Sequence, residues 1–174
     1  IIIDITIPAA PSLIGAYTTA GFAQGVEISS DGNTAYVAQH SSGLAIIDIT
    51  NPVSPGLLGT FSTAGFSRGV EISDDGNTAY LAQSGDGLVI VDITNPASPS
   101  LLGGYNTLGY SHDVKISNDG GIAYMADGSG GLEILDISNP VAPSLIGSYD
   151  TAGNSIKIEL SNDGRTLYLA DQAE

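Results

Sequence analysis

The residues with the most chemical potential lie in short segments whose sequence changes along the chain. The segments GFAQG, GFSRG, GYSHD and GNSIK recur at steps of 44 residues, and QHSSG, QSGDG and DGSGG form a second varying set. Imidazoles, cations and aromatic rings can contact a ligand, and loops carry many binding residues. We therefore predict a binding face here, with unconstrained loop drift as the alternative. The candidate ligand-binding residues are Phe22, Gln24, His40, Phe66, Arg68, Tyr110, His112, Asp113 and Lys157.

A catalytic centre is not apparent among these residues. His112 and Asp113 could form a general base, but neighbours on a strand point to opposite faces, which is poor geometry for such a pair. The segment DGSGG lacks the lysine and the helix start of a phosphate-binding loop. The sequence contains no GxSxG, HExxH or DxDxDG signature. We therefore predict no catalytic residues and no enzymatic activity.

A column of charged residues offers a weaker candidate for a metal site. Glu27, Glu71, Lys115 and Glu159 occur at steps of 44 residues. If the repeats close into a ring and these residues face its central channel, the carboxylates could hold a hard cation such as Ca²⁺ or a water cluster. If they face a neighbouring unit, they need hydrogen-bond partners to offset burial. Without a metal signature we expect no bound metal and no cofactor.

The aromatic residues fall into three columns with the same step. Two columns contain an aromatic ring in every copy and are expected to be packing residues: Tyr17, Phe61, Tyr105, Tyr149 and Tyr36, Tyr80, Tyr124, Tyr168. The third runs Phe22, Phe66, Tyr110 and then Asn154. Its rings could stack on a sugar, contact a peptide, or pack over the mouth of a channel.

These columns reflect an internal repeat, and the repeat predicts the elements. One unit contains four short segments with the pattern of β-strands: SRGVEIS, TAYLAQ, LVIVDIT and SLLGGYNT. An Asp-Gly pair between the first two segments suits a hairpin turn. Four antiparallel strands in about 40–45 residues are typical of a β-propeller blade. LVIVDIT is apolar on both faces, as expected for a strand between two neighbouring blades. Its aspartate can accept N–H bonds from the turn that follows.

The same segments resemble a known family. GLVIVDITNPASP resembles the signature of the LVIVD repeat family, and ISDDGNTAYLA resembles hairpins of YVTN and WD40-like blades. The resemblance implies a β-propeller-like fold and proteins that are mostly prokaryotic and often secreted or attached to the cell surface. It implies no shared catalytic residues.

We predict an all-β fold in which residues 1–174 form one β-propeller of four-stranded antiparallel blades. The repeat units are expected at 1–22, 23–66, 67–110, 111–154 and 155–174, with the first and last together making one blade. Ile1 to Ile5 should then lie beside Leu167 to Ala170. A ring of eight blades from two chains, or a slice of a longer array, remains open.

Composition limits the function. A formal charge of −15 with four Lys or Arg argues against nucleic acid and anionic membrane surfaces as partners. There is no cysteine for a disulfide or a thiolate site, and no apolar run is long enough to cross a bilayer. With the surface or secreted location that the resemblance implies, we expect a non-enzymatic extracellular or cell-surface module that binds protein or carbohydrate. The alternative is a structural subunit of a surface layer or filament that self-associates through β-edges; a hydrolase or other propeller enzyme is least favoured.

Overall fold

The computed structural model describes residues 1–172, and every regular element in them is a β-strand. No helix in that range is long and apolar enough to span a membrane. The predicted all-β fold is confirmed, and the described range contains sixteen strands. The strands are β1 (Ile2–Asp4), β2 (Ser12–Gly15), β3 (Gly25–Ile28), β4 (Thr34–Ala38), β5 (Leu44–Asp48), β6 (Gly56–Phe61), β7 (Phe66–Ile72), β8 (Thr78–Ser84), β9 (Gly87–Asp92), β10 (Ser100–Tyr105), β11 (Asp113–Ile116), β12 (Ile122–Ala126), β13 (Leu132–Asp136), β14 (Ser144–Tyr149), β15 (Asn154–Leu160) and β16 (Leu167–Gln172).

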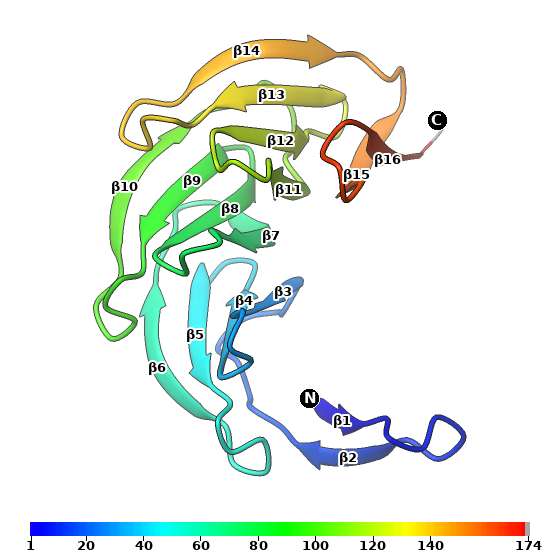
Figure 1. The fold of residues 1–174 in the computed structure, drawn as a ribbon. Coiled ribbons are helices and arrows are strands. Elements are labelled where there is room, and N and C mark those ends of the chain that lie inside the picture. The colour runs from blue at the N-terminus through cyan, green and yellow to red at the C-terminus, as the bar shows by residue number, and fades with distance from the viewer. Residues whose placement is uncertain (173–174) are drawn as a thin grey trace.

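The strands make three complete blades and two half blades along an open arc (Figure 1). Strands β3–β6, β7–β10 and β11–β14 each form a four-stranded antiparallel sheet in chain order. The hairpin β1–β2 stands at one end of the arc and the hairpin β15–β16 at the other (Figure 1). Strands β3, β7, β11 and β15 neighbour one another on the inner side, while β6, β10 and β14 run along the outside (Figure 1). This is the blade architecture of a β-propeller, as predicted.

The structure corrects the expectation that the two ends complete one blade. Among the strands of residues 1–172, β1 pairs only with β2 and β15 only with β16, so Ile1 to Ile5 do not lie beside Leu167 to Ala170. The physical reason is curvature: the blades turn gradually, and the two end hairpins remain apart (Figure 1). Repeat spacing predicts which strands are equivalent but does not encode the angle between neighbouring blades.

The core consists of apolar layers between consecutive blades. In β9, Leu88, Ile90 and Val91 are all fully buried, as expected for a strand covered on both faces. One layer joins the second blade, through Tyr80 and Leu88, to Val114 and its neighbours in the third blade. An equivalent layer joins the first and second blades. Apolar burial between blades therefore holds the arc together.

The repeated polar residues build the turns. Asp92 Oδ1 accepts hydrogen bonds from the backbone N–H of Thr94 at 2.9 Å and from its hydroxyl at 2.7 Å, and Asp48 and Asp136 bind their turns in the same way. This confirms the expected role of the aspartate that ends the third strand. Gly76, in the first turn of its blade, has φ of +71°, and Gly32, Gly120 and Gly164 share this conformation. Glycine adopts this region without the steric cost of a Cβ.

Candidate functional site

The variable segments lie along one rim of the arc, which we call the variable rim. It comprises the loops before the inner strands and the turns between the second and third strands of each blade: residues 20–24, 64–68, 108–112 and 152–156, and residues 39–43, 83–87 and 127–131. The opposite rim, which we call the constant rim, comprises the Asp-Gly turns and the Asn-Pro loops. The two rims differ in how much their sequence changes between copies.

A polar residue at or just after the end of each second strand anchors the variable rim, and it is buried in the three complete blades. Asp127 is fully buried and accepts bonds from the hydroxyls of Thr107 and Ser111, both at 2.6 Å, and from the N–H of Gly109 at 2.7 Å. Gln39 Oε1 accepts the N–H of Ala20 at 3.0 Å at the equivalent place. Sequence reasoning missed this column, although its signal was present. Its members are Gln39, Gln83, Asp127 and Asp171, at steps of 44 residues.

Backbone bridges join neighbouring blades at the same rim. His40 and Ser67 exchange two backbone hydrogen bonds of 3.0 and 2.9 Å, and Gly128 and Ser155 exchange two of 3.1 and 3.0 Å. Ser84 and Tyr110 form the third bridge of this type. The variable rim is therefore held in place by the scaffold although its side chains differ between copies.

Five of the nine predicted ligand-binding residues line one pocket on this rim. Gln24, Arg68, His112, Asp113 and Lys157 surround about 210 Å³ of space. Lys115 also lines it, so three of the four cationic side chains of the protein meet here. Glu27 and Asp113 line the same pocket, so its cationic and anionic side chains lie close together.

Salt bridges and hydrogen bonds define the charge of the pocket. Asp113 Oδ2 lies 2.9 Å from Lys157 Nζ and accepts the N–H of Ile158 at 3.1 Å. Asp113 thus faces the following hairpin, and it does not form a catalytic pair with His112. Burial and the nearby Arg68 charge lower the pKa of His112, which favours the neutral imidazole at neutral pH. Arg68 Nε donates to Ser84 Oγ at 2.5 Å, leaving its outer guanidinium nitrogens free of any protein hydrogen bond in the described residues.

The column Glu27, Glu71, Lys115 and Glu159 forms an ion pair rather than a ring of carboxylates. Lys115 Nζ lies 2.8 Å from Glu71 Oε2. Burial raises the pKa of Glu71 despite this lysine. Burial by itself would lower the pKa of Lys115, but the hydrogen bond and charge of Glu71, together with the charges of Glu159 and Glu27, raise it overall. Within residues 1–172, no three His, Asp or Glu side chains come together as a group that could hold a metal ion.

Three other predicted residues form an aromatic cluster. The rings of His40 and Phe66 stack with centroids 4.0 Å apart, and Phe22 meets His40 edge-on at 6.3 Å. Phe22 is 78% exposed. His40 has φ of +45° at a position where the third blade has Gly128, and such backbone strain is common at functional positions. Tyr110 is exposed but lies outside both the pocket and this cluster.

The constant rim has larger clefts, which the sequence did not predict. A cleft of about 680 Å³ lies between the turns of the first and second blades, and one of about 490 Å³ lies between those of the second and third. Asp74 and Asp75 line both clefts, which are strongly acidic. Because the same turn residues recur in every blade, these clefts follow from turn chemistry.

The blades, their layered packing and the repeated turns define a protein of the β-propeller class. The LVIVD repeat family matches residues 1–19, 20–63, 64–107 and 108–151. The chain belongs to the LVIVD repeat family, which confirms the resemblance.

Solved structures show the same fold at low sequence identity. A protein of Lactobacillus plantarum matches with a TM-score of 0.82 and 17% identity, over 98% of this chain and 57% of that one. Hydrazine synthase of Kuenenia stuttgartiensis matches with a TM-score of 0.72 and 19% identity, over 91% and 44%. The periplasmic gluconolactonase of Pseudomonas aeruginosa matches with a TM-score of 0.73 and 18% identity, over 86% and 50%. This chain thus spans about half the length of these structures. A comparison with curated proteins found no match.

Proposed function

We propose that this chain is a non-enzymatic extracellular or cell-surface module that binds a ligand through the variable rim. The observation that carries the proposal is the pocket around which Arg68, Lys115 and Lys157 gather, where both lysines are paired with carboxylates and Arg68, within the described residues, has no salt-bridge partner. The aromatic cluster of Phe22, His40 and Phe66 lies beside it, because Phe66 and Arg68 belong to the same short strand segment.

The chemistry of the rim favours a ligand with a carboxylate next to an apolar or ring-shaped part. A guanidinium binds a carboxylate through two parallel hydrogen bonds. Exposed aromatic rings can stack on a sugar ring or an apolar side chain. An acidic oligosaccharide or an acidic peptide would supply both features, within the protein and carbohydrate ligands expected from the sequence.

Arrays of acidic and neutral oligosaccharides and of acidic peptides test this function. We expect the labelled wild-type protein to bind the acidic probes on the array and not the neutral ones. Arg68→Ala and Phe66→Ala should each weaken that binding by about tenfold or more, as for residues central to an interface. Arg68→Ala should leave the free energy of unfolding within about 0.5 kcal/mol, as surface changes usually do.

The matched control is Asp74→Ala, an exposed change in the acidic clefts of the constant rim. It should leave binding unchanged. Binding that survives Arg68→Ala and Phe66→Ala but is lost in the Asp74→Ala variant would assign the function to the constant rim and overturn the proposal.

A structural role in a surface layer or filament is the second candidate. The specific observation in its favour is that β1 and β16 each have one edge that no other described strand pairs with. Unpaired strand edges are templates for association with another chain. Electron microscopy of the concentrated protein would test this role, because filaments should appear if the edges polymerise.

A further inference from the structure

The two ends of the arc expose apolar residues that are buried at equivalent positions within it. Tyr168, in β16, is 63% exposed, whereas Tyr36 and Tyr80, at steps of 44 residues, are each 6% exposed. At the other end Val26, in β3, is 63% exposed, whereas Val114 is fully buried. Within the arc these two columns pack against each other, as Tyr80 and Val114 do. Each exposed end residue therefore lacks the partner found at the other end.

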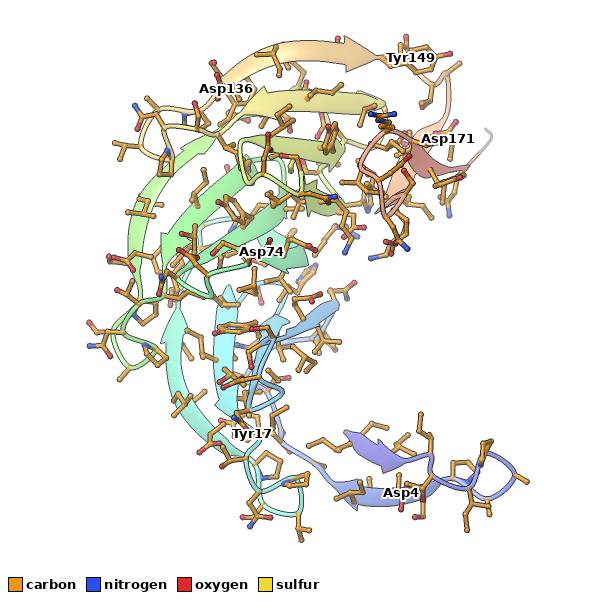
Figure 2. All side chains as sticks on the ribbon, in the orientation of Figure 1. Asp4, Tyr17, Asp74, Asp136, Tyr149 and Asp171 are labelled. Carbon is orange, nitrogen blue, oxygen red and sulfur yellow. The ribbon has the colours of Figure 1, made fainter. Side chains whose placement is uncertain are left out.

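The outer halves of the end blades show the same complementarity. Ile3 and Ile5, in and beside β1, are 46% and 70% exposed. Their equivalents Val91 and Ile93 are 0% and 2% exposed, because the preceding blade covers them. At the opposite end Tyr149 is 68% exposed, and Figure 2 shows it at the free end of β14. The first half blade lacks inner strands and the last half blade lacks outer strands, so each end provides what the other end needs.

A glycine in the fourth outer strand gives an independent indication. At Gly59 and Gly103, an added Cβ would collide with the carbonyl oxygens of Pro96 and Pro140, in the Asn-Pro loop of the next blade. Gly147 is their equivalent, but the nearest atom to a Cβ there would be Ile134 Cδ1 at 3.9 Å. In the repeat, the loop that should approach Gly147 is the one that contains Pro8. The column thus keeps a glycine at residue 147, although no loop of the described residues approaches it.

The curvature of the arc favours a second copy over the chain's own end as the missing partner. The end hairpins are far apart along the arc and are not paired with each other (Figure 1). The whole arc superposes on about half of larger propellers, with TM-scores of 0.72 to 0.82. Each copy has three complete blades and two halves, so two copies supply the strands of eight blades. Eight is within the usual range for propeller rings.

We propose that two copies of this chain close one eight-bladed ring, with β16 of each copy pairing antiparallel with β1 of the other. The register follows from the repeat. In the third blade Tyr124 is paired with Ile134, and Ala123 with Leu135. Applying the 44-residue repeat to this pairing places Tyr168 opposite Ile2 of the second copy and Leu167 opposite Ile3 of the second copy. Tyr168 then covers Val26, and the loop with Pro8 covers Gly147. The inference does not depend on the ligand proposed for the variable rim.

The first experiment measures the mass of the 174-residue chain in solution by sedimentation and native mass spectrometry. We expect twice the chain mass at micromolar and higher concentrations, with slow hydrogen exchange in β1 and β16. A monomer at every concentration would overturn the proposal, including one with protected amides in both strands, since this would show that the chain's own ends close. Fibres of many copies would also overturn the ring and would favour the filament role.

The second experiment uses the absence of cysteine. A chain carrying Ile2→Cys is mixed with a chain carrying Tyr168→Cys, and the mixture is oxidised. Opposed strand residues are close enough for a disulfide. We expect a covalent dimer in the mixture and none from either variant alone, because identical cysteines would lie at separate junctions. No cross-linked dimer in the mixture would contradict the register.

The third experiment separates docking from folding. Gly147→Ser should abolish the dimer while the monomer keeps its β circular dichroism, because a side chain there has open space in the single chain. Gly56→Ser is the matched control: Gly56 also has open space, and serine stands at the equivalent positions 12, 100 and 144. The control should dimerise normally. A Gly147→Ser protein that dimerises like the control would overturn the proposed junction.

Discussion

At the residue scale, the least satisfied group in the described chain is Glu133 in β13. It is 6% exposed, and its Oε2 has no hydrogen-bond partner. Burial and then the charge of Asp127 raise the pKa of Glu133. Its equivalents in the first and second blades are Ala45 and Val89, so the site accommodates an apolar side chain.

Replacing Glu133 with valine should therefore stabilise the protein at neutral pH by about 1–3 kcal/mol, the cost of an unsatisfied buried polar group. When folding raises a carboxyl pKa above its ordinary value of 4.5, the protonated carboxyl favours the folded state. This contribution to the free energy of unfolding is present below pH 4.5 and is lost as the pH rises through the folded pKa. The gain from Glu133→Val should thus be larger at pH 7 than at pH 4. Urea unfolding of both proteins at the two pH values measures it, and an equal gain at both would contradict this account.

Gly76 allows a second test at the same scale. Its φ of +71° is costly for a β-branched residue, although a Cβ would meet no atom within 4 Å. Gly76→Val should therefore lower the free energy of unfolding by about 1–2 kcal/mol through backbone strain alone. Gly56→Val, at an equally open position without positive φ, is the control and should cost much less. Thermal or urea unfolding of both variants decides between strain and crowding.

At the scale of elements, each first turn is organised by one aspartate. Asp75 accepts the hydroxyl of Ser73 at 2.6 Å and the backbone and side-chain N–H groups of Asn77, both at 3.0 Å. The hydroxyl of Ser73 and then the N–H groups of Asn77 lower the pKa of Asp75. Asp31, Asp119 and Asp163 likewise accept the equivalent serine hydroxyl and the backbone N–H two residues further on.

A lowered carboxyl pKa stabilises the fold above the ordinary value of 3.8, and that contribution is lost as pH falls through the folded pKa. Asp75→Asn should therefore destabilise the protein at pH 7 and flatten its loss of stability on acidification below about pH 4. Unfolding free energies measured from pH 7 to pH 2.5 provide the test. An acid limb as steep as that of the wild type would show that the turn aspartates do not drive acid unfolding.

At the scale of the whole molecule, net charge affects the proposed association. Each chain carries a formal charge of −15, so two copies repel each other until salt screens them. The junction residues Tyr168, Val26, Ile3 and Ile5 are apolar, so added salt screens the repulsion between the copies without weakening the junction itself. The dimer should therefore tighten between low and moderate NaCl in sedimentation experiments. Weakening with salt would indicate a contact held by ion pairs instead.

The sequence predicts the blades and their turns better than their arrangement. Asp92 and Gly76 have the expected roles because turn geometry depends on neighbouring residues only. The variable rim was predicted as a face, but not the anchoring of its loops by Asp127, which depends on residues 16 to 20 positions away. Closure within one chain was predicted wrongly, because ring size depends on small angles summed over several blades.

The backbone bridges on the variable rim have a mechanical consequence. His40–Ser67, Ser84–Tyr110 and Gly128–Ser155 fasten successive blades along one side of the arc. Because the bridges fix the distance between neighbouring blades at this rim, a change in the opening angle of the arc requires each blade to rotate about the bridge that joins it to the next. A molecule lodged between two blades at this rim would alter that angle, and the angle in turn sets how far apart the two free ends stand. Ligand binding at the variable rim and the distance between the two ends of the arc are thus coupled. A pair of distance probes attached to the two ends would therefore detect binding at the rim.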